Sequence, residues 1–172
     1  SESDILNCIK QIDVEVMKQF KIVYKEGEIK KGRNLLAFEV AKRNVYNFLK
    51  VELESVIAGD VIKILALEQR YERIFEHSSL PFPIKIGGSV DRIELRNGIL
   101  RIIDYKTGAV TKNDLKMKDW DLLITDEKYG KCFQVLFYAY IYRHNNKVMG
   151  EMESGIYSFK KLNSGFLKFN DT

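Results

Sequence analysis

The stretch GGSVDRIELRNGILRIIDYKTG, residues 87–108, decides the fold of this chain. Asn97-Gly98 at its centre is the strongest short signal for a two-residue β-hairpin turn, because both residues tolerate the positive φ angles that such a turn needs. Apolar and β-branched residues are frequent on either side of the turn. We therefore predict two antiparallel strands, residues 84–95 and 99–106.

The turn also sets the register of the predicted hairpin, because Arg96 must then face Ile99. One face of the hairpin should carry the pairs Leu95/Leu100, Ile93/Ile102, Asp91/Asp104 and Ser89/Lys106, and the other face Glu94/Arg101 and Arg92/Ile103. The apolar pairs suit a core, and Glu94/Arg101 suits a cross-strand ion pair.

The predicted pair Asp91/Asp104 places two carboxylates opposite each other, with β-carbons ~4.5–5.5 Å apart. Like charges repel there, and the neighbouring apolar pair makes the repulsion worse. A divalent cation removes the problem, since carboxylate, water and phosphate oxygens together suit magnesium. Lys106 is expected on the same face, where an ammonium can orient the attacking water or neutralise charge on a phosphate. This set of residues predicts a hydrolytic phosphodiester site.

A simpler interpretation of the hairpin stays open at this point. Residues 104–108 could be a polar strand end that leads into a glycine turn, with Asp91 an exposed partner of Arg92. A register slip of one residue would also place the two carboxylates on different faces.

The rest of the chain alternates between helical and strand-like periodicity. The predicted elements are helices over 4–22 and 34–56, a loop over 27–34, strands over 61–71 and 154–161, and a helix over 131–144. The last helix is apolar almost all round and should be buried. This order predicts an α/β fold with a central mixed β-sheet flanked by helices.

Composition limits the class of protein. The 172 residues are 45% hydrophobic and 30% charged, as in a globular protein, and the formal net charge of +4 mildly favours nucleic acid as a partner. Cys8 and Cys132 form no Cys-x-x-Cys pair, so we expect buried thiols and a reducing, cytoplasmic setting. No apolar run reaches the ~20 residues of a membrane span, so no membrane association is expected.

The quoted stretch resembles the nuclease motif of the RecB/AddB family within the PD-(D/E)XK superfamily. That motif has a Gly-x-x-Asp-Arg-Ile strand, a hairpin and Asp-Tyr-Lys-Thr-Gly, followed by a helix with Gln-x-x-x-Tyr. The matching residues here are Gly88, Asp91, Arg92, Asp104, Lys106, Gln134 and Tyr138. The resemblance covers roughly residues 60–160 and implies the restriction-endonuclease-like core of that superfamily.

The resemblance implies a role for each matching residue. Asp91, Asp104 and the backbone carbonyl of Tyr105 would bind the metal, Lys106 would be the catalytic lysine, and Gln134 and Tyr138 would line the site near the DNA backbone. Glu68 on the preceding strand is a further candidate ligand, with an ordinary surface glutamate as the alternative. The implied reaction is hydrolysis of DNA phosphodiesters by water activated at Mg²⁺, for which Mn²⁺ can substitute, as an exonuclease in DNA repair and recombination.

The sequence departs from the family in two ways. Relatives often carry a metal-binding histidine on an early helix, whereas His77 and His144 are not placed for that role. Glu39 is a candidate substitute, with a solvated helix face as the alternative. The iron–sulfur cysteines of some relatives are absent, so no cluster is expected.

We expect residues 1–172 to form a single nuclease domain, with N-terminal helices over 1–56 and a catalytic core over 60–160. A longer parent protein with a helicase-like region or partner subunit is also expected. Two alternatives remain: a catalytically silent nuclease fold that binds DNA or scaffolds a complex, and a structure-specific endonuclease. The complete Asp-Asp-Lys set argues against the silent fold, which has no need of a repulsive pair.

Overall fold

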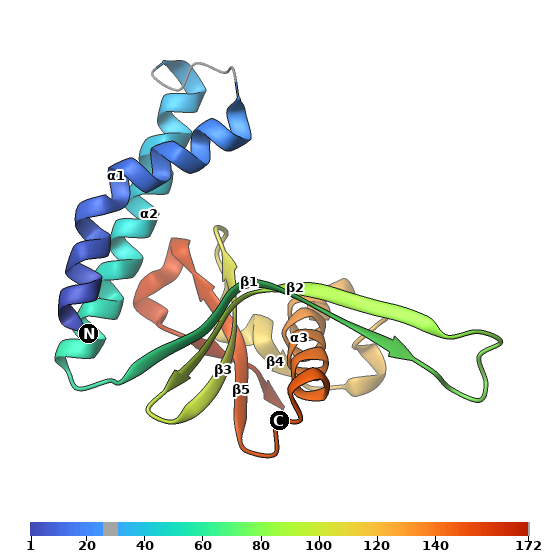
Figure 1. Cartoon of the computed structure of the whole chain (residues 1–172). Helices are drawn as coiled ribbons and strands as arrows, with labels where there is room; N and C mark the ends of the chain where they lie inside the picture. Colours follow the sequence, from blue (N-terminus) through green and yellow to red (C-terminus); the bar gives the residue numbers. More distant parts are fainter. Residues whose placement is uncertain (26–30, 172) are drawn as a thin grey trace. The chain divides into compact units, whose positions relative to one another are not determined.

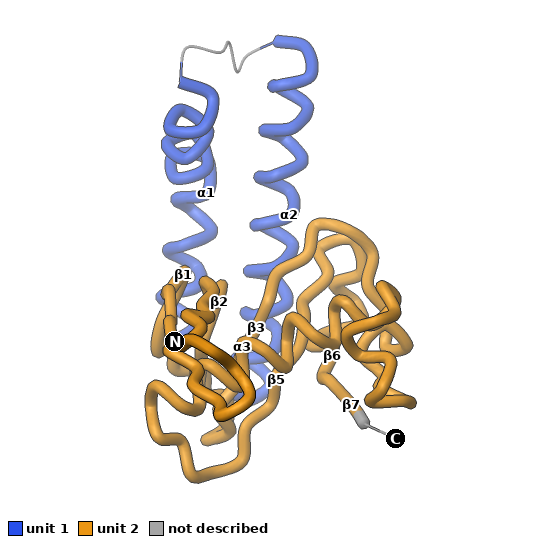
Figure 2. The backbone as a smooth tube through the Cα atoms, turned by 90° about the vertical axis from the view of Figure 1, so that its right-hand side faces the viewer, with its two compact units in different colours: residues 1–60 blue, residues 61–172 orange. Residues whose placement is uncertain are grey.

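The computed structural model describes residues 1–25 and 31–171. The chain divides into two compact units, residues 1–60 and residues 61–172, shown in different colours in Figure 2. The boundary falls between the predicted N-terminal helices and the first predicted strand.

The first unit is a pair of helices, α1 (Glu2–Tyr24) and α2 (Gly32–Ile57). They pack through apolar side chains at helical spacing, with Phe20 edge-on to Phe38 at a centroid distance of 5.3 Å. Both helices were predicted. The predicted loop over 27–34 is wrong from Gly32 onward, because α2 begins there, and its residues 27–30 lie outside the described part of the chain.

The second unit contains a five-stranded sheet in the order β1-β2-β3-β5-β6. Its strands are β1 (Ile62–Phe75), β2 (Ile84–Arg96), β3 (Ile99–Lys106), β5 (Met152–Ser158) and β6 (Leu167–Lys168). Only β3 and β5 pair in parallel among these neighbours, and the crossover between them contains α3 (Gly130–Asn146). This mixed sheet with helices is the predicted α/β fold.

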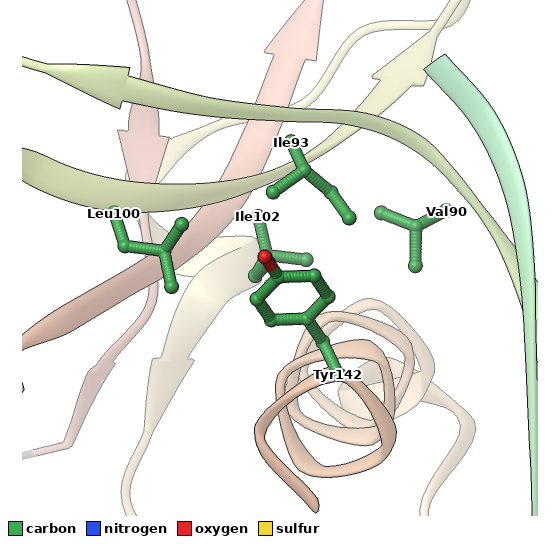
Figure 3. Close-up of a cluster of buried hydrophobic side chains, with 5 residues drawn as sticks. All are labelled: Val90, Ile93, Leu100, Ile102 and Tyr142. Atoms are coloured by element: carbon green, nitrogen blue, oxygen red, sulfur yellow. The ribbon is translucent and has the colours of Figure 1, made fainter. Parts of the chain in front are cut away.

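Helix α3 packs on the sheet (Figure 1), and a cluster of buried apolar side chains from both lies between them. In Figure 3 the ring of Tyr142 reaches from α3 toward buried side chains of β2 and β3, namely Val90, Ile93, Leu100 and Ile102. This helix was expected to be buried; Val135 and Ile141 are buried, but Phe133 and Arg143 are exposed. Of the two thiols, Cys132 is buried as expected, whereas Cys8 is exposed.

The segment between β3 and α3 folds into short turns around one brief strand. Its elements are η1 (Lys112–Leu115), β4 (Lys116–Met117), η2 (Trp120–Leu122) and η3 (Glu127–Tyr129), and β4 pairs in parallel with β7 (Asn170–Asp171). A second buried cluster, which includes Val110, Leu115 and Val135, joins this segment to α3 and the sheet.

The predicted last strand over 154–161 is wrong beyond Ser158. Ser158 pairs with Lys106, the last residue of β3, so any extension of β5 would have no partner on that side. The chain instead turns through η4 (Phe159–Ser164). No helix among the described residues combines the length and the apolar character that crossing a membrane requires.

Candidate active site

The hairpin turn forms as predicted. Asn97 and Gly98 have φ angles of 52° and 84°, the positive values that a two-residue turn of this kind needs. The structure has the predicted pairs Arg96/Ile99, Leu95/Leu100, Glu94/Arg101, Ile93/Ile102 and Arg92/Ile103. The register near the turn is therefore confirmed.

The backbone ladder between β2 and β3 ends at Arg92/Ile103, so the predicted pairs Asp91/Asp104 and Ser89/Lys106 are not ladder pairs among the described residues. Val90 and Ile93 both belong to the cluster under α3, although strict alternation would place residues three apart on opposite faces. The pleat of β2 is therefore interrupted around Asp91, and alternation alone could not give the direction of this side chain.

The carboxylate of Asp91 accepts a hydrogen bond from a backbone N–H of β3 that does not take part in the β2–β3 ladder. Its Oδ2 accepts a hydrogen bond of 2.7 Å from the backbone N–H of Tyr105 on β3. The carboxylate thus bridges the two strands at the point where their backbones stop pairing. This contact ties Asp91 to the residue that follows Asp104.

Asp104 is buried, with 3% of its surface exposed. Its Oδ1 accepts a hydrogen bond of 2.9 Å from Nε2 of Gln134 on α3. Its Oδ2 lies 3.0 Å from Nζ of Lys106 but has no hydrogen bond of good geometry and no access to water. Burial raises the pKa of Asp104 above its ordinary value, Lys106 opposes that shift, and the charge of Asp91 adds to it. The last effect means that the two carboxylates interact electrostatically.

Glu68 lies on β1 between the ladder pairs Leu67/Arg92 and Gln69/Val90, which places it opposite Asp91. Its φ of 47° is unusual for a residue other than glycine and adds to the irregularity at this point. Burial and the charge of Asp91 both raise the pKa of Glu68. Glu68 is therefore near Asp91 but remains exposed.

Helix α3 supplies two polar side chains from one face, Gln134 and Tyr138. Nε2 of Gln134 lies 3.0 Å from the Tyr138 hydroxyl as well as in contact with Asp104. The ring of Tyr138 packs on β2 at Gly88, where an added β-carbon would lie 2.9 Å from Cε1 of Tyr138. The glycine of the motif thus lets the helix approach the strand closely.

The predicted ion pair between Glu94 and Arg101 is wrong, although the two residues face each other. Glu94 is fully buried and forms ion pairs with Arg92 and Arg96, which lie two residues away on the same face of β2. Nε of Arg101 instead lies 2.7 Å from Oε2 of Glu153, its register partner on β5. The sequence alone could not show that Glu153 on β5 would lie nearer to Arg101 than Glu94 does.

Arg92 also holds Tyr105 in place, a role that the sequence did not predict. Its guanidinium donates a hydrogen bond of 3.2 Å to the hydroxyl of Tyr105, whose ring stacks on Phe159. Tyr105 is therefore held at its backbone by Asp91 and at its hydroxyl by Arg92. The only signal in the sequence is that Arg92 directly follows Asp91 in the motif.

The oxygen donors at this site suit a hard divalent cation. The buried Oδ2 of Asp104 is an acceptor without a well-formed hydrogen bond, and the carboxylate of Asp91 belongs to the same cluster. Within the described residues, no group of three or more His, Cys, Asp or Glu side chains is arranged to hold a metal ion. A cation here would therefore draw on two aspartates, backbone oxygen, water and substrate.

The two histidines, His77 and His144, lie in the parts of the fold that the sequence predicted. His77 follows β1 and contacts Ser79, and His144 contacts the backbone of Tyr140 near the end of α3. Glu39 is exposed on α2, with Nζ of Lys42 at 3.5 Å. Neither histidine contacts either aspartate in the described structure.

A family model described as the PD-(D/E)XK nuclease superfamily matches residues 22–169. The chain belongs to this superfamily. The match spans the predicted core, all of α2 and the last residues of α1, and the fold of this family accords with the mixed sheet and flanking helices. A search of curated proteins found no match. PD-(D/E)XK membership confirms the broader part of the resemblance, while the RecB/AddB type stays a prediction.

Proposed function

We propose that this PD-(D/E)XK protein is a divalent-metal-dependent deoxyribonuclease of the RecB/AddB type. The observation that carries the proposal is the buried Oδ2 of Asp104, which lacks a well-formed hydrogen bond and lies beside Lys106 in a cluster with Asp91. Such an arrangement is costly for a purely structural site and suits cation binding. Mg²⁺ is the expected ion, and Mn²⁺ is the expected substitute.

The proposed metal ligands are Asp91, Asp104 and the carbonyl of Tyr105, with Glu68 as a further candidate. When bound, the cation would supply Lewis-acid stabilisation of the charge that develops on the scissile phosphate. Oδ1 of Asp104 accepts hydrogen bonds from Nε2 of Gln134 at 2.9 Å and from Nζ of Lys106 at 3.3 Å, and Oδ2 lies 3.0 Å from the same Nζ. Asp91 is held by the backbone N–H of Tyr105.

Lys106 is proposed as the catalytic lysine. Its ammonium lies 3.0 Å from Oδ2 of Asp104, and its side chain is one-third exposed. Lys106 can therefore contact both the Asp104 carboxylate and an incoming substrate. From there it can orient the attacking water or offset negative charge on the phosphate. Tyr138 and Gln134 are proposed to contact the DNA backbone beside it.

The finer parts of the proposal follow the resemblance. An exonuclease that acts in DNA repair and recombination, in the cytoplasm and beside a helicase-like region or subunit, is the expected context, and no iron–sulfur cluster is expected. A silent DNA-binding fold remains the main alternative. The Asp104–Lys106 pair favours the active form, because a silent fold has no need of a buried carboxylate with an unmatched oxygen.

The test is digestion of linear DNA with Mg²⁺ by the wild type, Asp104→Ala and Lys106→Ala. We expect each variant to lose activity by about 100- to 1000-fold, the usual effect of removing a group that stabilises transition-state charge. Asp121→Ala and Lys160→Ala are matched controls, because both residues are exposed and distant in sequence from the motif. A closed circular substrate separates endonuclease from exonuclease activity.

A second measurement reports on the metal without relying on cleavage. Mg²⁺ or Mn²⁺ should raise the melting temperature of the wild type, because a ligand that binds only the folded state stabilises it. Asp91→Asn and Asp104→Asn should lose that increase. Equal digestion by all proteins would show that the site is misassigned, and binding of metal without digestion would favour the silent fold.

A further inference from the structure

The segment between β3 and α3 encloses a basic pocket that the proposed reaction does not use. The pocket has a volume of about 420 Å³, and its lining consists of Thr111, Asn113, Asp114, Lys116, Lys118, Lys128 and Tyr129. Figure 1 shows this segment, in yellow to light orange, beside α3. Three of these seven residues are lysines and only one is acidic.

The acid in the pocket is already neutralised by other groups. Asp114 accepts hydrogen bonds from the backbone N–H and the hydroxyl of Thr111, at 2.8 and 2.6 Å. Its other oxygen lies 3.0 Å from Nζ of Lys131 on α3. Asp114 therefore has little capacity left to offset the lysines of the pocket.

Two of the three lysines have no counter-charge among the side chains that the structure describes. Lys116 and Lys118 form no ion pair and no side-chain hydrogen bond with the side chains that the structure describes. Lys128 lies 2.9 Å from Asp126 at the rim. Acidic and basic residues balance in residues 1–60, so the net charge of +4 belongs to residues 61–172, which contain the pocket. The pocket is thus suited to an anion.

The pocket is linked to the candidate active site through α3. Lys131, which binds Asp114, and Gln134, which binds Asp104, are three residues apart on this helix. Residues at that spacing share a face and are separated by about 4.5 Å along the axis. Asp114 at the pocket and Asp104 at the candidate active site therefore contact one face of α3.

We propose that the Lys116–Lys118–Lys128 pocket binds a phosphate group of the DNA strand whose scissile phosphate lies at Asp104. The inference rests on the proposed nuclease function and adds a second anchoring point for its substrate. The phosphate could be an internal diester or a terminal monoester, since both present the same anionic oxygens. Lys116 and Lys118 supply charges without an ion-pair partner among the described side chains, and Asn113 supplies a polar group beside them.

The test compares binding of the double variant Lys116→Gln/Lys118→Gln with that of the wild type. A fluorescent single-stranded oligonucleotide is titrated in EDTA, so that binding is measured without cleavage. We expect roughly five- to tenfold weaker binding at 0.1 M salt. The slope of log affinity against log salt concentration should also become shallower, by about 0.7 for each phosphate that the double variant no longer neutralises. The matched control is Lys160→Gln/Lys161→Gln, which removes the same charge from two exposed lysines outside the pocket.

Oligonucleotides with and without a terminal phosphate distinguish the two sources of the anion. If a monoester occupies the pocket, the wild type should prefer the phosphorylated strand and the double variant should lose that preference. If a diester occupies the pocket, the double variant should bind all of the oligonucleotides with equally reduced affinity. Binding equal to that of the control variant overturns the proposal, even where Asp104→Ala abolishes digestion. Lysine-dependent binding without any digestion would instead support the pocket and contradict the nuclease.

Discussion

Burial of the Asp104 carboxylate destabilises the folded state, yet its position suits a metal-binding site. This carboxylate is buried and its pKa is raised by that burial, so the ionised form is disfavoured in the folded chain. Lys106 offsets part of this cost, and Gln134 satisfies one oxygen. The remaining oxygen is available to a cation, which fits a site that is completed by metal and substrate.

Asp114 shows the opposite electrostatic behaviour. Hydrogen bonds from Thr111 and the ion pair with Lys131 lower its pKa from 3.8 to about 2, against the effect of burial. The folded state therefore binds fewer protons than the unfolded state between about pH 2 and pH 4. Stability from Asp114 is present above about pH 4 and is lost as the pH falls toward 2.

We predict that Asp114→Asn lowers the free energy of unfolding by about 2 kcal/mol at pH 7. The difference from the wild type should narrow as the pH falls below about 4, because the native carboxylate then becomes protonated. Urea unfolding at several pH values measures both effects. Asp121→Asn is the control, and a difference that stays constant with pH would contradict the assigned cause.

At the scale of elements, the approach of β6 to β5 depends on one glycine. Gly155 pairs with Lys168, and a β-carbon at Gly155 would lie 2.2 Å from the backbone oxygen of Leu167 and 2.8 Å from the ring of Phe166. A backbone atom cannot move aside as a side-chain end can. The edge strand would therefore have to shift away from the sheet.

We predict that Gly155→Ala lowers the free energy of unfolding by about 3 kcal/mol, the upper part of the range for overpacking. Gly150→Ala is the matched control, since a β-carbon there meets nothing within 4 Å. Chemical denaturation of the two variants makes the comparison. Equal stability of both would show that β6 can separate from β5 at no cost to the fold.

The two units differ in how much apolar surface they bury. In residues 1–60, the buried side chains among those described are Ile12, Phe38, Phe48 and Glu52. The described part of residues 61–172 contains buried apolar clusters around the sheet and α3. Since stability follows buried apolar area, the helical pair should be the weaker unit.

We predict that urea unfolds the chain in two separable transitions. Trp120 is the single tryptophan and belongs to residues 61–172, so its fluorescence reports on that unit, whereas circular dichroism at 222 nm reports mainly on α1 and α2. The dichroism signal should disappear at the lower urea concentration. Coincident transitions by the two probes would show instead that both units unfold together.

Local rules account for much of what the sequence determined by itself. Asn97-Gly98 specified the turn, and the turn specified the register of Arg92–Arg96 on Ile99–Ile103, because backbone geometry allows few alternatives over two residues. Helical periodicity likewise predicted α1 and α2, and the apolar run over 131–144 predicted α3. The motif residues Asp91, Asp104 and Lys106 could therefore be assigned to one end of a hairpin.

The arrangement of side chains at the Asp91–Asp104 end of the hairpin was decided only by tertiary structure. The pleat breaks at Asp91, whose carboxylate binds the backbone of Tyr105, because Val90 and Ile93 both pack under α3. Gln134 donates a hydrogen bond to Asp104 from the same helix whose Tyr138 lies close to β2 at Gly88. These interactions join residues far apart in the chain, and their geometry depends on packing between elements, which no local pattern encodes.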